Sequence, residues 1–254
     1  MEFTRLPRPA IIAHRGASLY SPENTIAAFE LAVQQGADAI ELDAKLCGSG
    51  EIVVIHDQTV DRTTTGKGYV NRLSLPELKR LDAGSFFDVA YRGEKIPTLE
   101  EVFEAVGRKT FINVELTNYA SPLDDLPLKA VALVKKLDMS ERVFFSSFNI
   151  LSLLRARRIL PQVPACLLSP AGFARSWLYR FTNLLFRFTA LHPEHSDLTQ
   201  TLVQYASRRH QRIHAWTVNS SEEIHRLILL NVDGIITDDP LTARQVLTSI
   251  RQEL

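Results

Sequence analysis

The sequence predicts a (β/α)8 TIM barrel with a small insertion after its second strand, because short β-branched runs alternate with helical patterns along its length. Strands that alternate with helices form parallel βαβ units. Eight strand runs of this kind can be counted, and eight units close a barrel whereas six favour an open doubly wound sheet. No GxGxxG motif follows the first strand, which argues against a dinucleotide-binding sheet.

The strands and helices can be assigned in chain order. The predicted barrel strands cover residues 10–13, 39–46, 111–116, 143–148, 165–169, 190–192, 212–218 and 234–237. A helix after the first strand follows turn and cap residues at 21–24 and stops at Gly36. Further helices are expected over 126–137, 150–160, 198–209, 221–230 and 241–250. The length of 254 residues suits a single barrel domain, 1–254.

The segment 46–96 interrupts this alternation. It contains an additional strand at 52–56 and turn-rich stretches at 63–68 and 82–84. In barrels of this class, the loops at the carboxyl ends of the strands carry the chemistry. We therefore expect an insertion at about 46–96 that folds over the mouth of the barrel.

The composition narrows the function classes. Lys+Arg and Asp+Glu both number 29, so the formal net charge is zero, whereas a general nucleic-acid binder would show a basic excess. Cys47 and Cys166 show no metal-ligand spacing and are expected to be free, buried thiols. The N-terminus lacks a signal-peptide pattern, and no apolar run approaches the length of a membrane span. A cytoplasmic location is therefore expected, without an integral membrane segment.

Three carboxylates are predicted to converge at the barrel mouth. Glu41 and Asp43 point the same way because side chains alternate along a strand. Glu115 ends the next barrel strand, and adjacent strands lie about 4.8 Å apart. Buried carboxylates require a counter-charge, which a cation or a Lys or Arg partner can supply. An oxygen-only cluster favours a hard cation, so Mg2+ or Ca2+ is the predicted cofactor.

Two histidines end strands beside these carboxylates. His14 follows the first strand, and His56 ends the strand of the insertion. A lone histidine in such a place is more often structural, whereas two beside a metal-like cluster favour catalysis. Imidazoles can take a proton from a nucleophile and protonate a leaving alkoxide near neutral pH, as phosphodiester hydrolysis requires. Arg15 can donate paired hydrogen bonds to phosphate, with a surface ion pair as the alternative.

These motifs, taken in order, resemble the signature of the glycerophosphodiester phosphodiesterase family. The matching stretches are His14-Arg15-Gly16-Ala17, Pro22-Glu23-Asn24-Thr25, Glu41-Leu42-Asp43, His56-Asp57, Asp61-Arg62-Thr63-Thr64, Ile96-Pro97-Thr98-Leu99, Val114-Glu115-Leu116, Ser147-Phe148-Asn149, Trp216-Thr217-Val218-Asn219 and Asp233-Gly234-Ile235-Ile236-Thr237-Asp238. Any one stretch is weak evidence, but the ordered set covers nearly the whole chain and is highly specific.

The resemblance implies metal-dependent hydrolysis of glycerophosphodiesters to sn-glycerol 3-phosphate and an alcohol. It implies an acid/base pair, three metal ligands, a phosphate-binding arginine and an asparagine that fixes the loop around the first histidine. In this sequence the acid/base pair is His14 and His56, and the metal ligands are Glu41, Asp43 and Glu115. The phosphate-binding arginine is Arg15, and the asparagine is Asn24. Near later strand ends, His192 and Trp216 are weaker candidates for substrate contact, with structural packing as the alternative.

One position departs from the family pattern. The family usually has Lys two residues after the third carboxylate, where this chain has Thr117. The same-face rule puts residue 117 beside Glu115, near the expected phosphate. The change removes a positive charge, so substrate choice and rate are affected more than the fold. Our sequence-based hypothesis is that a loop arginine, Arg175 or Arg187, compensates.

The segment 173–188 can be interpreted in two ways, and the interpretation affects which function is predicted. Aromatic and aliphatic residues recur there at helical spacing among arginines. The segment is either an outer barrel helix or an apolar lip for peripheral contact with a lipid tail or membrane surface. The second interpretation would favour a lysophospholipase D over an enzyme for water-soluble diesters. A non-catalytic phosphodiester-binding barrel is a further alternative, which only Thr117 favours.

Overall fold

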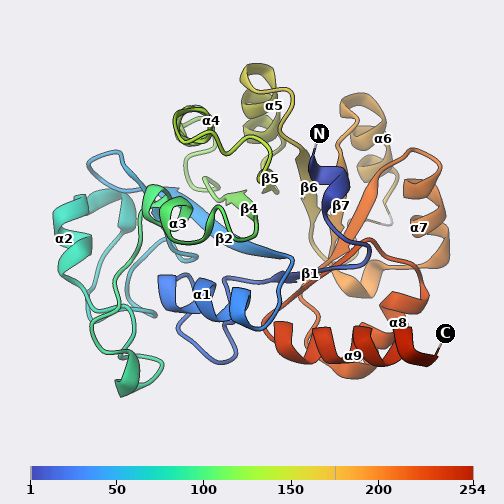
Figure 1. The fold of residues 1–254 in the computed structure, drawn as a ribbon. Coiled ribbons are helices and arrows are strands. Elements are labelled where there is room, and N and C mark those ends of the chain that lie inside the picture. Colours follow the sequence, from blue (N-terminus) through green and yellow to red (C-terminus); the bar gives the residue numbers. More distant parts are fainter. Residues whose placement is uncertain (1, 175, 254) are drawn as a thin grey trace.

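Eight parallel strands form a closed barrel in the computed structural model, which describes residues 2–174 and 176–253. The sheet order is β1-β9-β8-β7-β6-β5-β4-β2-β3, and an additional pairing of β1 with β2 closes the ring. The strand β3 (Ile52–Val54) pairs antiparallel with the end of β2 and lies outside the ring. Helices surround the barrel (Figure 1), so the predicted fold class is confirmed.

The barrel strands follow the apolar runs of the sequence. They are β1 (Ala10–Ala13), β2 (Ala39–Leu46), β4 (Phe111–Leu116), β5 (Val143–Ser147), β6 (Ala165–Ser169), β7 (Ala190–Pro193), β8 (Arg212–Ala215) and β9 (Gly234–Thr237). Nearly all of their residues are buried, because one face lines the barrel interior and the other packs against helices. β5 and β8 end before the predicted residues 148 and 218, and Phe148 and Trp216, which directly follow the two strands, contact each other.

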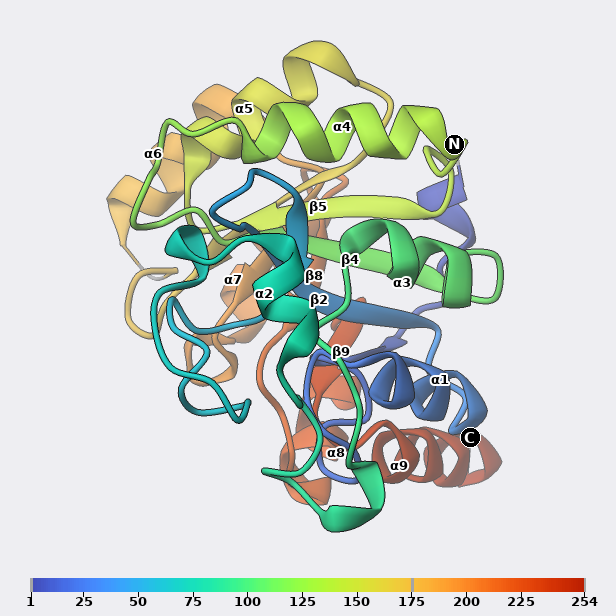
Figure 2. The ribbon, with the colours of Figure 1, turned by 90° about the vertical axis from the view of Figure 1, so that its left-hand side faces the viewer.

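The helices mostly match the predicted ranges. They are α1 (Ile26–Gln34), α2 (Leu75–Arg80), α3 (Leu99–Val106), α4 (Leu126–Lys136), α5 (Ile150–Ile159), α6 (Trp177–Phe186), α7 (Gln200–Ser207), α8 (Ser221–Leu229) and α9 (Pro240–Glu253). Figure 2 shows α4 and α5 on one side of the strands and α8 and α9 on the other. The sequence did not predict α3, although it starts with a capping box formed by Thr98 and Glu101.

The segment between β2 and α3 has a small apolar core of its own. Its buried members are Cys47, Val53, Ile55, Val60, Val70, Leu78, Ala83 and Ile96. In Figure 1 its helix α2 lies outside the ring formed by the other helices. The hydroxyl of Tyr91 donates to the carbonyl of Tyr20 at 2.9 Å, which ties the segment to the loop after β1. The segment thus lies against the mouth of the barrel.

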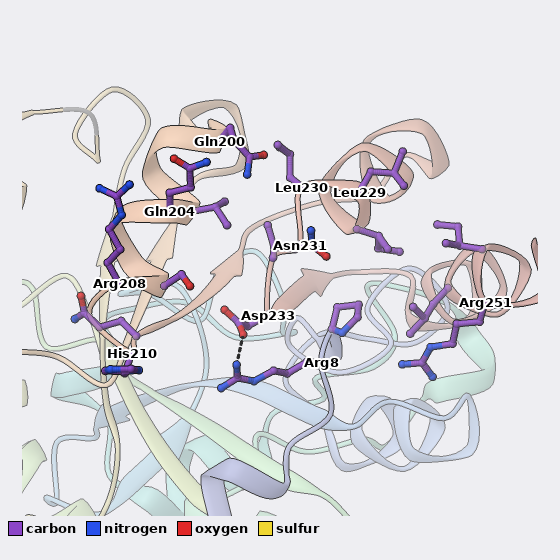
Figure 3. A pocket seen from close by; sticks show the side chains of 18 residues that line it. Arg8, Gln200, Gln204, Arg208, His210, Leu229, Leu230, Asn231, Asp233 and Arg251 are labelled. Atoms are coloured by element: carbon purple, nitrogen blue, oxygen red, sulfur yellow. Dashed lines mark ion pairs between the residues drawn. The ribbon is translucent and has the colours of Figure 1, made fainter. Parts of the chain in front are cut away.

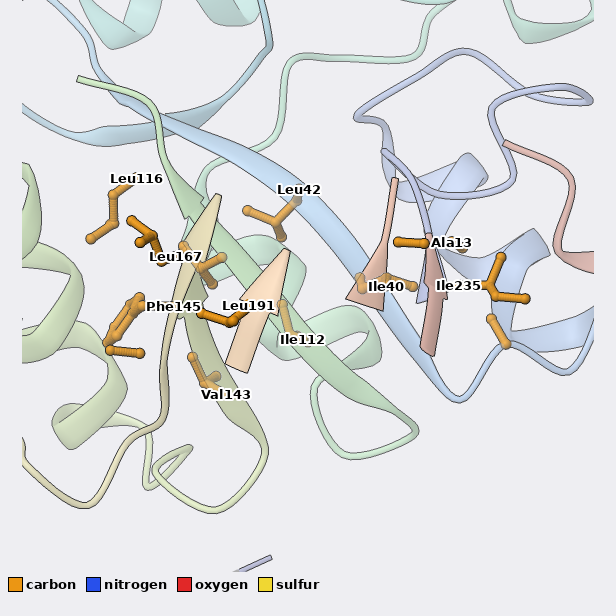
Figure 4. Close-up of a cluster of buried hydrophobic side chains, with 14 of the residues drawn as sticks. Ala13, Ile40, Leu42, Ile112, Leu116, Val143, Phe145, Leu167, Leu191 and Ile235 are labelled. Atoms are coloured by element: carbon orange, nitrogen blue, oxygen red, sulfur yellow. The ribbon is translucent and has the colours of Figure 1, made fainter. Parts of the chain in front are cut away.

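Two apolar layers hold the barrel together. The larger one fills the space between strands and helices and includes Leu42, Ile112 and Phe145 (Figure 4). The other includes Phe144 and Cys166, which face the barrel interior, together with Phe3 from the N-terminal segment. Both cysteines are free and buried, as predicted.

Candidate active site

Two neighbouring strands bring the three predicted carboxylates together. In the register of β2 and β4, Asp43 lies opposite Glu115, and Glu41 shares the face of Asp43 because strand side chains alternate. One oxygen from each of the three carboxylates lies within 4.8 Å of the others. Glu41 and Asp43 are 3% and 2% exposed, so the cluster is removed from water. Two strands therefore build a compact, oxygen-only site at their carboxyl ends.

The charges in this cluster are only partly compensated by the chain. Burial and the neighbouring Asp43 raise the pKa of both Glu41 and Glu115 above the usual range of a carboxyl group. The pKa of Asp43 is instead lowered, since Arg15 and His56 outweigh the effect of burial. The Oε1 atom of Glu41 is buried and has no hydrogen-bond partner among the described residues. An unpartnered carboxylate oxygen and repelling neighbours fit a site for a hard divalent cation.

The loop after β1 holds Arg15 against the cluster. Arg15 has a left-handed φ of 55°, and its backbone N–H donates to Glu41 at 3.0 Å. Its Nε lies 3.3 Å from Asp43, and its Nη1 donates to Glu23 at 3.0 Å. Gly16 has a φ of 86°, and a Cβ there would lie 2.7 Å from the backbone of Ala28. The arginine is therefore in a largely buried ion pair, in place of the surface ion pair considered from the sequence.

Asn24 fixes this loop to the second strand. Its side-chain amide donates to Asp43 at 2.8 Å, and its side-chain oxygen accepts from the Asp43 N–H at 3.3 Å. Its own backbone N–H donates to the carbonyl of Arg15 at 3.0 Å. Asn24 is 4% exposed and has a φ of 58°, a conformation that asparagine tolerates better than most residues. It therefore orients one of the three carboxylates and the loop that follows His14.

Each of the two predicted catalytic histidines has a carboxylate partner. His14 Nδ1 lies 2.7 Å from Asp238, which follows β9 and also accepts from Ser18 at 2.9 Å. His56 Nδ1 lies 2.7 Å from its neighbour Asp57. Both imidazoles contribute to the lowered pKa of Asp43, which places them near the cluster. A carboxylate bound to one ring nitrogen leaves the other nitrogen available for proton transfer.

A salt-bridge network links the inserted segment to the loop after β1. Arg62 donates to Asp57 at 2.7 Å and to Glu23 at 2.6 and 2.8 Å. Glu23 in turn accepts from Arg15. The hydrogen bond from Arg62 and that with His56 lower the pKa of Asp57 to about 2, so the Asp57 carboxylate stays ionised beside His56. The network positions His56, on the inserted segment, relative to Arg15 on the barrel.

Aromatic side chains form one side of the mouth. Phe148 contacts both Tyr119 and Trp216 edge to face, with ring centroids 5.7 and 5.6 Å apart. The hydroxyl of Tyr119 donates to Glu115 at 2.5 Å. Trp216 is half-buried, and its indole N–H donates to the carbonyl of His192 at 2.7 Å. The rest of the indole is thereby held at the mouth, where it was predicted.

The predicted substrate contact of His192 does not agree with the structure. Its side chain is fully buried and packs against Phe144 and His214, with ring centroids 6.3 and 4.8 Å apart. Burial lowers its pKa to about 3, so the imidazole is neutral near neutral pH. The strand alternation that takes Leu191 outward turns His192 into the barrel interior, below the mouth. Its role is packing, the alternative named above.

The hypothesis that Arg187 compensates for Thr117 is also wrong. Arg187 follows the last turn of α6, and helices in this fold return the chain to the amino ends of the strands. It therefore lies at the end of the barrel opposite the three carboxylates. The other candidate, Arg175, lies outside the described residues.

Several residues of the site were not predicted as functional residues. These are Glu23, Asp57, Arg62 and Asp238, which hold the predicted residues in place, and Lys45, which lies on β2 two residues beyond Asp43. Four of them lie in or next to the motifs that carried the resemblance. A stricter rule could have found Lys45 and Asp238, since same-face neighbours on β2 and polar residues at the ends of barrel strands face the mouth.

A large groove lies away from this cluster. It runs between α7, α8 and α9, and residues that precede β8 and β9, such as His210 and Asp233, line it (Figure 3). Arg8 and Asp233 form an ion pair there at 3.2 Å. Barrel enzymes carry their chemistry at the opposite, carboxyl end, and none of the three clustered carboxylates lines this groove. We therefore assign the active site to the mouth.

Among the described residues, no helix combines the length and the apolar character that crossing a bilayer requires.

Comparisons with known proteins point to one family. The sequence model of the glycerophosphoryl diester phosphodiesterase family matches residues 14–242. A glycerophosphodiester phosphodiesterase of Caldanaerobacter subterraneus is 43% identical over 91% of this chain and 95% of its own length. A relative of the same name from Bacillus altitudinis is 35% identical over 96% of this chain and 98% of its own length.

Solved structures agree with this result. A phosphodiesterase of Oleispira antarctica, in complex with its product sn-glycerol-3-phosphate, superposes with a TM-score of 0.89 at 30% identity. The match covers 97% of this chain and 99% of that one. A glycerophosphodiester phosphodiesterase of Agrobacterium tumefaciens gives a TM-score of 0.80 at 29% identity, over 92% and 98% of the two chains. The chain belongs to the glycerophosphoryl diester phosphodiesterase family.

Proposed function

We propose that this enzyme hydrolyses glycerophosphodiesters to sn-glycerol 3-phosphate and an alcohol, with a divalent cation and two histidines at the barrel mouth. The observation that carries the proposal is the convergence of Glu41, Asp43 and Glu115 within 4.8 Å of one another, beside two carboxylate-bound imidazoles. The names of the relatives at 43% and 35% identity support the same activity. The product complex of the Oleispira antarctica protein supports glycerol 3-phosphate as the product.

The three carboxylates would hold Mg2+ or Ca2+. Their oxygens match the ligands that hard cations prefer, and the unpartnered Oε1 of Glu41 is available to it. When bound, the cation would stabilise negative charge on the phosphoryl oxygens. Asn24 and Tyr119 hold Asp43 and Glu115 in place by hydrogen bonds, which keeps the ligand set preorganised. The cation would also relieve the repulsion that raises the pKa of Glu41 and Glu115.

The two histidines would move the protons of the reaction. One imidazole takes the proton from the nucleophile, and the other protonates the leaving alkoxide. Asp238 and Asp57 each bind Nδ1 of their histidine, so Nε2 is the atom that faces the reaction in both cases. Arg15, already placed between Glu23 and Asp43, would donate hydrogen bonds to the phosphate as it enters.

A panel of water-soluble glycerophosphodiesters and long-chain lysolipids tests this function. Each is offered with Mg2+, Ca2+ or a chelator, and glycerol 3-phosphate is measured with a coupled dehydrogenase. We expect cation-dependent release of glycerol 3-phosphate from the water-soluble diesters. No release from any diester with either cation would contradict the proposal. Hydrolysis confined to lysolipids, with release of the headgroup alcohol, would establish the lysophospholipase D alternative instead.

The outer face of α6 supports peripheral contact with a lipid surface. Phe181, Leu184 and Leu185 are 49%, 50% and 59% exposed there, and Ile159 at the end of α5 is 41% exposed. Residues 150–193 contain six arginines but no Asp, Glu or Lys, in a chain of zero net charge. Exposed apolar side chains in a segment whose only charged residues are arginines favour contact with an anionic membrane surface. The side chains of Trp177, Leu178 and Arg180 lie outside the described part of this helix.

Sedimentation with vesicles tests this contact. The protein is mixed with vesicles of phosphatidylglycerol or of phosphatidylcholine, and a Leu184→Gln/Leu185→Gln variant serves for comparison. We expect the wild-type protein to sediment with the anionic vesicles and the variant to remain in the supernatant. Equal sedimentation of both proteins, or none with anionic vesicles, would contradict a lipid-binding face.

A further inference from the structure

Lys45 is a buried lysine beside the three carboxylates. It lies on β2 two residues beyond Asp43, so the alternation of the strand turns both side chains to the same face. Lys45 is 9% exposed. Its ammonium donates to the hydroxyl of Thr117 at 2.7 Å and to the carbonyl of Thr117 at 3.2 Å. The ammonium of Lys45 thus lies against the side chain of Thr117, which directly follows the neighbouring strand β4.

The partners of this ammonium are neutral. Both of its hydrogen bonds within the described chain end on Thr117, and no ion pair within 4.0 Å is found for it among the described residues. Burial lowers its pKa, while the nearby carboxylates of Asp43 and Glu115 raise it. Burying a charge without an ionic partner is costly. A divalent cation bound by the carboxylates would compete with the ammonium of Lys45 for their negative charge. An anionic ligand would then supply the ionic partner that Lys45 lacks.

Thr117 is suited to hold the lysine in this place. Its hydroxyl accepts from Lys45 and donates to the carbonyl of Ala44 at 2.7 Å, which fixes the hydroxyl between the two strands. Two of the three ammonium protons are used by Thr117, so a third can be donated to a bound ligand. If Lys45 formed a structural salt bridge, its ammonium would instead contact a carboxylate oxygen.

We propose that Lys45 binds the phosphoryl group of the substrate, and that it supplies from β2 the positive charge that the family usually carries on a lysine at position 117, directly after β4. The inference rests on the proposed function, because it assumes that the phosphate lies at the three carboxylates. It replaces the hypothesis of a compensating loop arginine. It also explains why a chain without the usual lysine retains both histidines and all three acidic residues.

A transfer of the charge between the two strands tests the proposal. Lys45→Met removes the ammonium, and the double variant Lys45→Thr/Thr117→Lys returns it from the neighbouring strand. Lys136→Met, which removes a surface lysine paired with Glu100, is the matched control. We measure kcat and KM for a glycerophosphodiester that the wild-type enzyme hydrolyses, the binding of glycerol 3-phosphate by calorimetry, and thermal unfolding of each variant.

We expect Lys45→Met to weaken the binding of glycerol 3-phosphate and to lower kcat/KM roughly 10- to 100-fold, the range of a charge-assisted hydrogen bond. The kcat/KM of the double variant should recover to within about tenfold of the wild-type value. Lys136→Met should not differ from the wild-type enzyme. A merely structural lysine would change the unfolding temperature in Lys45→Met without a recovery of activity in the double variant.

Two outcomes would overturn the inference. One is a Lys45→Met variant that binds glycerol 3-phosphate and turns over like wild type. The other is a double variant that unfolds at the wild-type temperature and remains as impaired as Lys45→Met. If Lys45→Met does not fold, Lys45→Gln and the double variant carry the test. Failure of the proposed function is distinct, because the wild-type enzyme itself would then release no glycerol 3-phosphate.

Discussion

Four histidines of this barrel form two pairs with opposite surroundings. His14 and His56 lie at the mouth, and each has a carboxylate 2.7 Å from its Nδ1. His192 and His214 lie in the barrel interior, and no ring nitrogen of either has a hydrogen-bond partner among the described residues. The interior rings face each other and Phe144. The residue type is the same, but only the mouth pair has carboxylate partners, whereas the interior pair packs against aromatic rings.

The difference shows what a buried barrel requires of an ionisable group. At the mouth, Arg15 and the histidines outweigh burial and lower the pKa of Asp43, so this carboxylate stays charged. In the interior, burial lowers the pKa of His192 and His214, and no carboxylate of the described residues offsets it. Those two side chains are then neutral packing elements. The neighbours of an imidazole, and not its strand position alone, therefore decide whether a charged form is stabilised.

The largest expected effect separates the two pairs by activity. His14→Ala and His56→Ala should each lower kcat about 10²- to 10⁴-fold, because each removes a proposed proton-transfer group. His192→Leu should change kcat only a few-fold, since its ring does not reach the mouth. Steady-state kinetics on the diester that wild type prefers checks this, with the exposed His225→Ala as a control. Equal losses for His192→Leu and His14→Ala would abolish the distinction.

A smaller effect is expected from the carboxylate partners of the mouth pair. Asp238→Asn keeps the shape of the side chain but removes the charge-assisted hydrogen bond to His14. We expect a loss of roughly 10- to 100-fold in kcat, with little change in the unfolding temperature. Asp57→Asn should act in the same direction on His56. Wild-type kcat in both variants would show that the imidazoles need no orientation by these carboxylates.

The interior pair should make the fold sensitive to acid. The pKa of His192 is lowered from 6.5 to about 3 in the fold, so the unfolded chain takes up a proton first as the pH falls. The stabilising contribution is complete above pH 6.5 and is lost as the pH falls toward 3. The lowered pKa of His192 alone should decrease the free energy of unfolding by roughly 2 kcal/mol between pH 7 and pH 5. Urea unfolding at several pH values measures this decrease. An equally steep decrease in the His192→Leu variant would refute the role of His192 in acid sensitivity.

The smallest effect is expected from the network that joins the inserted segment to the mouth. Arg62 is 46% exposed and bonds Asp57 and Glu23. Because exposed ion pairs contribute little, Arg62→Ala should lower the stability by about 1 kcal/mol or less. KM should rise a few-fold, since His56 and Arg15 lose a shared tether. A loss of activity as large as that of His56→Ala would show that Arg62 has a direct role in the reaction.

Much of the fold and of the mouth follows from local sequence pattern. The eight strands could be predicted because both of their faces are buried, and Glu41, Asp43 and Glu115 could be placed together from strand alternation. His14 and His56 end strands, so their place at the mouth also follows. Local pattern was not sufficient for His192, because its strand is four residues long and the direction of its side chain depends on the register with β6 and β8.

Other parts of the site depend on contacts between distant segments. Asp238 binds His14 across 224 positions of sequence, and Lys45 reaches Thr117 across 72. Neither pairing has a local signal, since it arises only when the barrel closes β9 onto β1 and sets β2 beside β4. Arg187 shows the converse. Its segment looked suitable from composition, but the return of α6 to the amino end of the barrel takes it away from the mouth.

Calorimetric titration with Mg2+ and with Ca2+ shows whether Glu41, Asp43 and Glu115 share one divalent cation, as we propose. Wild-type protein should bind one ion at this site, and Glu41→Gln and Asp43→Asn should each lose that binding. The variant Glu101→Gln, which changes an acidic group at the start of α3, should bind as wild type does. Unchanged binding in Glu41→Gln and Asp43→Asn, or no binding of either ion by the wild-type protein, would contradict the account.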